Sequence, residues 1–234
     1  MKAMFMTKLK TRAVLLFTLA GIAVGAGLPS YRVLAAQATV AGKEAAAEDK
    51  SGIDGEGFVR QWLVLLPIPF AANESASDAF NREQIKDEAG LKPKAGDKVK
   101  VGETEFVWQK KTAASHLLDF LAILDKKEND DSVAYAVTYI VAPKELKGVK
   151  MKTGSDDQCR VYLNGKEVFN FPDCRAAEKD QDTTLVTLRQ GINVLVAKVV
   201  NCNNEWEFCV RFTDRDGKPL TTLKAQVGNL ALGR

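Results

Sequence analysis

Short runs in which apolar and polar residues alternate recur along the chain from Phe58 onward, and turn residues separate them. Alternation with a period of two is typical of β-strands that bury one face. Many short strands with turn residues between them predict an antiparallel β-sandwich, and the strand–helix–strand alternation of a parallel sheet does not occur. The predicted strands are 62–70, 105–110, 133–142, 149–153, 159–163, 166–171, 184–188, 193–200, 205–213 and 220–227.

Two turn sequences predict how neighbouring strands connect. Asn164-Gly165 is a strong hairpin signal because both residues tolerate a positive φ. Asn203-Asn204 predicts a second hairpin, between the strands on either side of it. The strand 62–70 contains two prolines, so we expect it to end there or to lie at a sheet edge.

Helical signals are few. Segment 77–89 is the one good helix candidate in the first half of the body, with Ser77 or Asp78 as its N-cap. Segment 113–124 is apolar without a clear period, so a helix and a buried strand both stay open. We therefore expect a mainly β domain with one or two short helices.

The N-terminus has the three-part layout of an export signal. Basic residues precede the uncharged run 13–28, and a small-residue cleavage site lies before Ala36. The segment 1–36 is therefore a signal peptide or a retained hydrophobic helix, with 13–36 as the membrane anchor, and either places the body outside the cytoplasm. The polar segment 37–57 is expected to be a flexible linker, and the β-sandwich domain is expected to span 58–227.

Charge and histidine content narrow the function classes. The 234 residues carry a net charge of +3, but five basic residues and no acidic ones fall in the first 35 positions. The body is close to neutral with mixed signs, so we expect no nucleic-acid partner. His116 is the single histidine, which excludes a multi-histidine metal site. A hydrolase or esterase would have to use His116, and no Gly-x-Ser-x-Gly motif accompanies it.

The four cysteines are Cys159, Cys174, Cys202 and Cys209. An exported chain meets an oxidising compartment, so disulfides are expected. Four cysteines allow three connectivities. We favour two local bridges, Cys159–Cys174 around the first predicted hairpin and Cys202–Cys209 around the second. Zinc is less favoured because no Cys-x-x-Cys spacing occurs.

One stretch resembles a known family. Residues 153–168 read TGSDDQCRVYLNGKEV, and residues 188–193 read LRQGIN. They resemble the galactose-binding-like β-sandwich, or jelly-roll, modules of bacterial glycoside hydrolases and planctomycete surface proteins, over roughly residues 58–225. The resemblance implies this sandwich fold and leaves the ligand open. The further residues that match the pattern are Trp206, Arg211, Asp214 and Gly217.

The leader has a resemblance of its own. Residues 2–10, KAMFMTKLK, together with the apolar run, resemble the membrane segment of planctomycete extracytoplasmic-function sigma factors. The sigma regions themselves do not occur in this chain. The resemblance implies an outer domain held at the membrane.

Asp156 and Asp157 are candidate calcium ligands. Adjacent carboxylates before a strand supply the oxygen ligands that Ca²⁺ prefers. The sequence around Asp156 and Asp157 also resembles that of PA14-type lectins. This resemblance implies a site that binds both calcium and sugar. The alternative is turn chemistry, in which Asp side chains accept hydrogen bonds from nearby backbone N–H groups.

The predicted turn 203–206 is a candidate carbohydrate-binding loop. Trp206 would stack on a sugar face, and Asn203, Asn204 and Glu205 would bind hydroxyl groups. The alternative is a core tryptophan, because Trp206 shares a strand face with Phe208 and Val210.

These observations favour an exported, non-catalytic β-sandwich module that binds carbohydrate or another cell-envelope component, with calcium as the one cofactor considered. The alternative is a membrane-anchored structural or sensory domain that binds a protein partner. A hydrolase or esterase is the least favoured reading.

Overall fold

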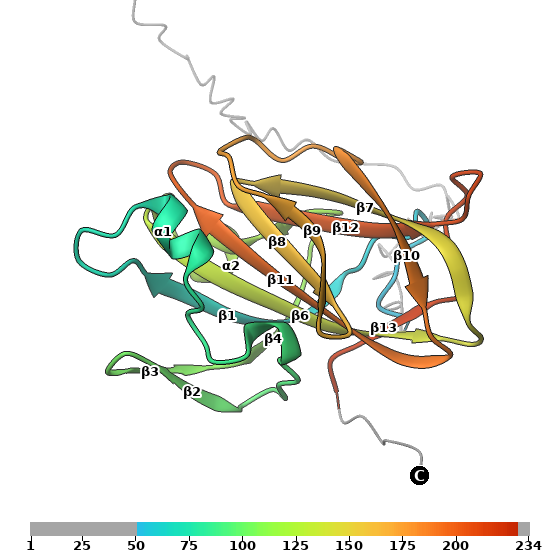
Figure 1. The fold of residues 1–234 in the computed structure, drawn as a ribbon, viewed down its shortest axis with the longest axis horizontal. Helices are drawn as coiled ribbons and strands as arrows, with labels where there is room; N and C mark the ends of the chain where they lie inside the picture. The colour runs from blue at the N-terminus through green and yellow to red at the C-terminus, as the bar shows by residue number, and fades with distance from the viewer. Residues whose placement is uncertain (1–50, 229–234) are drawn as a thin grey trace, which may run out of the picture. The chain divides into compact units, whose positions relative to one another are not determined.

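The computed structural model describes residues 51–228, and these form a β-sandwich with two short α-helices (Figure 1). The predicted fold class is therefore confirmed. The predicted leader 1–36 and most of the predicted linker lie outside the described residues. Within 51–228, no helix is long and apolar enough to cross a membrane.

Two antiparallel sheets form the sandwich. The larger sheet has seven strands, in the order β4 (Gln109–Thr112), β1 (Gln61–Pro69), β6 (Ser132–Ala142), β11 (Gly191–Asn201), β8 (Gln158–Leu163) and β9 (Lys166–Phe171), with β13 (Lys224–Gln226) also paired to β6. The smaller sheet has four strands, in the order β10 (Asp182–Leu188), β7 (Leu146–Asp156), β12 (Glu207–Thr213) and β5 (Leu118–Asp119). The helix α2 (Phe120–Leu124) follows β5 directly, with Asp119 as its N-cap.

The main core lies between the two sheets. Alternate residues of each strand face it, such as Val64 of β1 and Met151 of β7. Phe208, Val210 and Phe212 of β12 also belong to this core. A strand that buries one face alternates apolar and polar residues. The period of two in the sequence therefore reflects the packing of one sheet against the other.

The other face of the seven-stranded sheet is also covered. The segment between β1 and β4 covers this face. It contains helix α1 (Ala76–Asn81), the short 3₁₀ turn η1 (Glu88–Gly90) and the hairpin of β2 (Lys98–Val101) and β3 (Thr104–Val107). A second core forms there, around Phe80, Trp108 and Tyr135. Strand β6 is buried on both faces, which explains why its sequence is almost continuously apolar.

The predicted helix 77–89 is wrong in length. It begins after the N-cap Ser75, two residues earlier than expected, and ends at Asn81. The buried Lys198 lies on the sheet below, and its Nζ donates to the carbonyl oxygens of Phe80 at 3.0 Å and Arg82 at 2.5 Å. If the helix continued, these carbonyl oxygens would accept hydrogen bonds from backbone N–H groups of its next turn. The ammonium group of Lys198 takes the place of those donors.

The same lysine belongs to a buried polar cluster. Lys198 Nζ lies 3.3 Å from the carboxylate of Glu88, which also accepts hydrogen bonds from the hydroxyls of Tyr135 and Tyr162. Buried charges need such partners. The cluster fixes the segment after α1 against the sheet.

One predicted connection needs correction. Strands β11 and β12 belong to different sheets, so Asn203-Asn204 lies in a crossover between sheets and not in a hairpin. The strand 62–70 ends at its prolines as expected: β1 ends at Pro69, and beyond Val64 it pairs with β6 alone. The Asn164-Gly165 hairpin between β8 and β9 is present, with both residues at positive φ.

The linker prediction is also too long. Ile53 is buried in the main core and bridges to Val59, and the carbonyl of Ser51 accepts a hydrogen bond from Ala225 N–H. Residues 51–57 therefore belong to the folded body. One buried isoleucine among polar residues is too weak a pattern to indicate this from sequence alone.

Candidate ligand-binding site at one end of the sandwich

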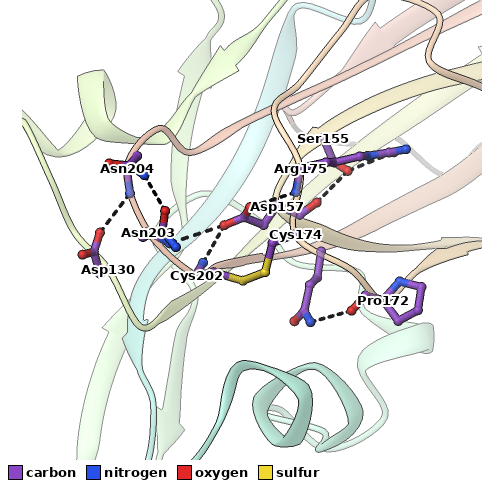
Figure 2. Close-up of a disulfide and its surroundings, with 10 residues drawn as sticks. Asp130, Ser155, Asp157, Pro172, Cys174, Arg175, Cys202, Asn203 and Asn204 are labelled. Carbon is purple, nitrogen blue, oxygen red and sulfur yellow. Dashed lines mark hydrogen bonds between the residues drawn. A yellow bond between two sulfur atoms is a disulfide. The ribbon is translucent and has the colours of Figure 1, made fainter.

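The candidate residues of the two predicted sites meet at one end of the sandwich. Strands β7 and β11 end there, at Asp156 and Asn201, and β12 and β6 begin there. The loops 125–131, 172–181 and 202–206 therefore come together although they are far apart in the chain. Figure 2 shows Asp157 between Cys202, Asn203 and Arg175.

Asp157 joins these loops through its carboxylate. Its Oδ2 accepts hydrogen bonds from the backbone N–H of Cys202 at 2.7 Å and of Asn203 at 3.4 Å, and its Oδ1 accepts one from the N–H of Arg175 at 3.0 Å (Figure 2). Burial raises the pKa of Asp157, and these three hydrogen bonds oppose that rise. Asp157 thus performs the turn role considered for it, and Oδ1 keeps capacity for another ligand.

Asp156 has no such partners. Its residue is only 6% exposed, yet its carboxylate accepts no hydrogen bond and makes no ion pair with any residue in 51–228. Burial, together with the neighbouring carboxylates of Asp157, Glu205 and Glu207, raises the pKa of Asp156 to about 7. A largely buried carboxylate without a protein donor is unfavourable unless water reaches it, it is protonated or it binds a cation.

A row of carboxylates extends from Asp156 across the smaller sheet. Asp156 of β7 pairs in register with Glu207 of β12, and Glu207 pairs with Asp119 of β5. Burial and the charges of Asp119 and Glu205 raise the pKa of Glu207. Asp119 accepts a hydrogen bond from Ala122 N–H at 2.8 Å as the cap of α2, so it has its own partner.

The basic residue beside this cluster is engaged elsewhere. The guanidinium of Arg175 pairs with Asp182, donates to the hydroxyl of Ser155 at 3.3 Å and lies over the ring of Phe171. Every influence on the pKa of Asp156 raises it. No cation of the described residues therefore offsets the charge at Asp156 itself.

A disulfide between Cys174 and Cys202 links two of the site loops (Figure 2). The predicted local bridges Cys159–Cys174 and Cys202–Cys209 are both wrong: Cys159 and Cys209 are buried free thiols. Cys202 and Cys209 cannot be hairpin partners because β11 and β12 lie in different sheets. Burial raises the pKa of Cys209 to about 12 and that of Cys159 further, so neither is a reactive thiolate.

The same sulfurs lie near a carboxylate. One oxygen of Asp157 and the Sγ atoms of Cys174 and Cys202 lie within 4.8 Å of one another. Because the disulfide joins the two sulfurs, they do not provide thiolate ligands.

The loop 202–206 exposes three of the predicted ligand-binding residues and buries the fourth. Asn203, Asn204 and Glu205 are exposed beside the acidic cluster, and Asn204 N–H donates to Asp130 at 3.2 Å. Trp206 is 0% exposed and packs against Phe120 in the main core, with ring centroids 5.0 Å apart. A sugar-stacking role for Trp206 is therefore wrong, and the alternation of β12 already favoured the core position.

A hollow of about 550 Å³ adjoins this loop and was not predicted from sequence. Phe70, Asn73, Asp130 and Asp131 are among the residues that line it, and Asp130 also contacts the 202–206 loop through Asn204. The polar composition of 125–131 suggests only a solvated turn. No local signal indicates that Asp130 lies beside a loop 74 residues away.

Comparisons with known proteins were made at the levels of family, sequence and structure. No family model matches the chain, and no curated protein matches its sequence. A solved structure with partial similarity is the PA14 domain of the antifreeze protein MpAFP, with a TM-score of 0.33 and 13% identity over 44% of this chain and 55% of that one. The chain therefore spans about half the length of this structural neighbour, and it is assigned to no family.

Proposed function

We propose that this protein is an exported β-sandwich module that binds carbohydrate with the help of a calcium ion at the Asp156–Asp157 corner. One observation carries the proposal: Asp156 is buried, has no hydrogen-bond donor in the described region, and lies beside three further carboxylates. Such a group is stabilised by a cation. The proposal refines the sequence expectation by removing Trp206 from the binding residues.

The residues present fit calcium. Ca²⁺ binds six to eight oxygen ligands, including carboxylates and backbone carbonyls. Both oxygens of Asp156 and one remaining acceptor position of Asp157 are free, and Glu205 and Glu207 add carboxylates that no described donor occupies. Histidine and free thiolate ligands, which transition metals prefer, do not occur among these residues.

Carbohydrate is the ligand class that suits the surroundings. A bound Ca²⁺ would offer coordination positions to sugar hydroxyls, and the amides of Asn203 and Asn204 would add hydrogen bonds. The adjoining hollow offers Asn73 and Asp131 for further hydroxyls and the ring of Phe70 for an apolar sugar face. The Cys174–Cys202 disulfide supports export, because such bonds persist in oxidising compartments.

The proposal is tested with the full-length chain by calorimetric titration of Ca²⁺ and by glycan-array binding in Ca²⁺ and in chelator. We expect Ca²⁺ binding with selective glycan retention that chelator abolishes. Asp156→Asn should lose both. Asp216→Asn is the matched control, because Asp216 is exposed in the turn after β12, at the opposite end of that strand.

Three outcomes decide between the functions considered. Absence of Ca²⁺ binding by the wild-type chain, or unchanged Ca²⁺ binding by Asp156→Asn, overturns the calcium assignment. Ca²⁺ binding without retention of any glycan overturns the carbohydrate assignment and favours a protein partner at the membrane. Glycan binding that survives chelator would show that the sugar site does not need the metal.

Hydrolytic activity gains no support from the geometry. His116 packs against Phe58 in a tilted arrangement, with ring centroids 5.2 Å apart, and makes no hydrogen bond or ion pair with another residue of 51–228. A general base needs a partner within hydrogen-bond reach. We therefore assign His116 no role in the proposed function.

A further inference from the structure

A second cavity, of about 440 Å³, lies at the opposite end of β11 from Asp157. It is formed where the start of β11 meets the Asn164-Gly165 hairpin and the loop after η1. Its volume falls in the range of small-molecule sites, about 300–1,000 Å³. The calcium proposal uses no residue of this cavity, which we call the β11-start cavity.

The walls of the β11-start cavity are held in place by buried hydrogen bonds. The buried side chain of Asn193 accepts from Arg189 N–H and donates to the Arg189 carbonyl, both at 2.8 Å. The amide of Asn164 donates to Asn193 at 2.9 Å, and its oxygen accepts from Val194 N–H at 3.0 Å. Tyr139 donates to the Pro93 carbonyl at 2.7 Å and so anchors the opposite wall. A wall fixed in this way is preformed, which lowers the entropic cost of binding.

The floor of the cavity is apolar. Leu91, Ile192 and Val194 line it and are only partly buried against the second core. Apolar surface left open in a preformed cavity favours a ligand with an apolar body.

The rim carries basic side chains without partners. Lys92, Lys94 and Arg189 line the cavity and are exposed, and none of their side chains makes an ion pair or hydrogen bond with a residue of 51–228. Two carboxylates lie near the rim. Asp97 accepts a hydrogen bond from the backbone N–H of Lys94 at 2.7 Å, and the carboxylate of Asp87 lies beside Gly90 of the cavity wall. Three cations thus face two carboxylates, and the remaining positive charge of the rim favours an anion.

From the apolar floor and the basic rim together, we infer that the β11-start cavity is a binding site for a small amphipathic anion, an apolar body that carries one phosphate or carboxylate. The anion pairs with Arg189 and Lys92, and the apolar body lies on Ile192 and Val194. A nucleic acid would need a longer basic stripe than three side chains provide.

The test uses 1-naphthyl phosphate as the probe, followed by its fluorescence on titration with the full-length chain in chelator. Neutral 1-naphthol tests the charge, and inorganic phosphate tests the apolar body. We expect 1-naphthyl phosphate to bind at least tenfold more tightly than either. The double variant Lys92→Gln/Arg189→Gln should weaken it at least tenfold, while Lys110→Gln, an exposed lysine of β4, should not change it.

Several results would overturn this inference. They are equal binding of 1-naphthol, equal binding of inorganic phosphate, or an unchanged affinity in the double variant whose circular dichroism matches that of the wild type. Asp156→Asn should leave probe binding unaltered, so failure of the calcium proposal and failure of this one are separable.

Discussion

Asp156 and Asp157 are adjacent in the chain but have opposite surroundings. Three backbone N–H groups hold the carboxylate of Asp157, whereas no described donor reaches that of Asp156. Asp157 therefore orders the loops, whereas the carboxylate of Asp156 would be stabilised by a proton or a cation. Of the two alternatives read from the sequence, turn chemistry describes Asp157, and calcium binding at Asp156 is the proposal.

The raised pKa of Asp156 predicts how calcium affinity depends on pH. Its value of about 7 lies above the ordinary 3.8, because burial and the charges of Asp157, Glu205 and Glu207 disfavour the ionised form. Ca²⁺ must displace the proton, so affinity should rise with pH up to about 7, with close to one proton released at pH 6. Calorimetry in buffers of different ionisation enthalpy measures this release, and a pH-independent affinity would contradict the prediction.

The raised pKa of Asp156 also affects the stability of the metal-free protein. Stability should fall with rising pH, whereas calcium affinity should rise. A folded-state pKa above the unfolded value means that the folded state binds more protons between pH 4 and 7. The free energy of unfolding should therefore fall as pH rises through that window. Asp156→Asn should reduce this pH dependence, which thermal melts of both proteins in chelator will measure.

At the scale of elements, the β8–β9 hairpin shows a turn that local chemistry determines. Asn164 and Gly165 have φ values of 54° and 81°. A Cβ added at Gly165 would approach only the Ala89 carbonyl, at 3.9 Å, so space does not restrict this position. The requirement for glycine is conformational.

Gly165→Val should lower the free energy of unfolding by about 1–2 kcal/mol, because a β-branched residue resists the left-handed region. Gly55→Val is the matched control: its φ is not in that region and a Cβ there meets nothing within 4 Å. Urea denaturation of both variants measures the difference. Equal stability of the two variants would mean that the turn adopts another type in solution.

The crossover between β11 and β12 shows the limit of such local reading. Its sequence resembles a hairpin, but its two strands enter different sheets. This crossover moves Cys202 away from Cys209 and toward Cys174, and it brings Asn203 to Asp157. The connection from β11 to β12 is thus a crossover and not a hairpin. This one difference explains why the predicted disulfides are wrong and why these residues meet at the site.

At the scale of the whole molecule, two candidate sites lie at opposite ends of β11 and differ in charge. The Asp156 end is acidic, and the β11-start cavity carries a basic rim. The Cys174–Cys202 disulfide closes the acidic end across 28 residues of chain. It therefore couples overall stability to the geometry around Asp157.

Loss of this disulfide should lower the free energy of unfolding by about 3–4 kcal/mol on the chain-entropy relation. It should also weaken Ca²⁺ binding, because the N–H groups of Cys202 and Arg175 hold Asp157. Urea denaturation and calorimetry of Cys174→Ala/Cys202→Ala measure both effects. Reductant should destabilise the wild type and not this variant.

Peptide mapping under non-reducing conditions checks the pairing itself. We expect one bridge, Cys174–Cys202, with Cys159 and Cys209 alkylated only after unfolding. A bridge between Cys202 and Cys209 would contradict the crossover between the two sheets.

The sequence alone determined most of the longer strands, the first hairpin and the β-sandwich class, because alternation and turn chemistry act between residues two to four positions apart. The predicted strand 105–110 is wrong, because the structure divides it between β3 and β4, which lie in different sheets. The sequence also indicated Asp156, Asp157 and the loop 203–205, since clustered carboxylates and amides are visible locally. The short α1 was not predictable, because Lys198, more than a hundred positions away, takes its last carbonyls.

Only the tertiary structure decided which strands share a sheet, which cysteines pair and which carboxylates meet. Asp119, Asp156 and Glu207 form one row through pairings of β5, β12 and β7. Such pairings form when the two sheets and the segment between β1 and β4 pack together. They depend on residues far apart in the chain, so a short stretch of sequence does not indicate them. The unpartnered state of Asp156 is likewise a property of the assembled loops, and so the functional proposal depends on the fold.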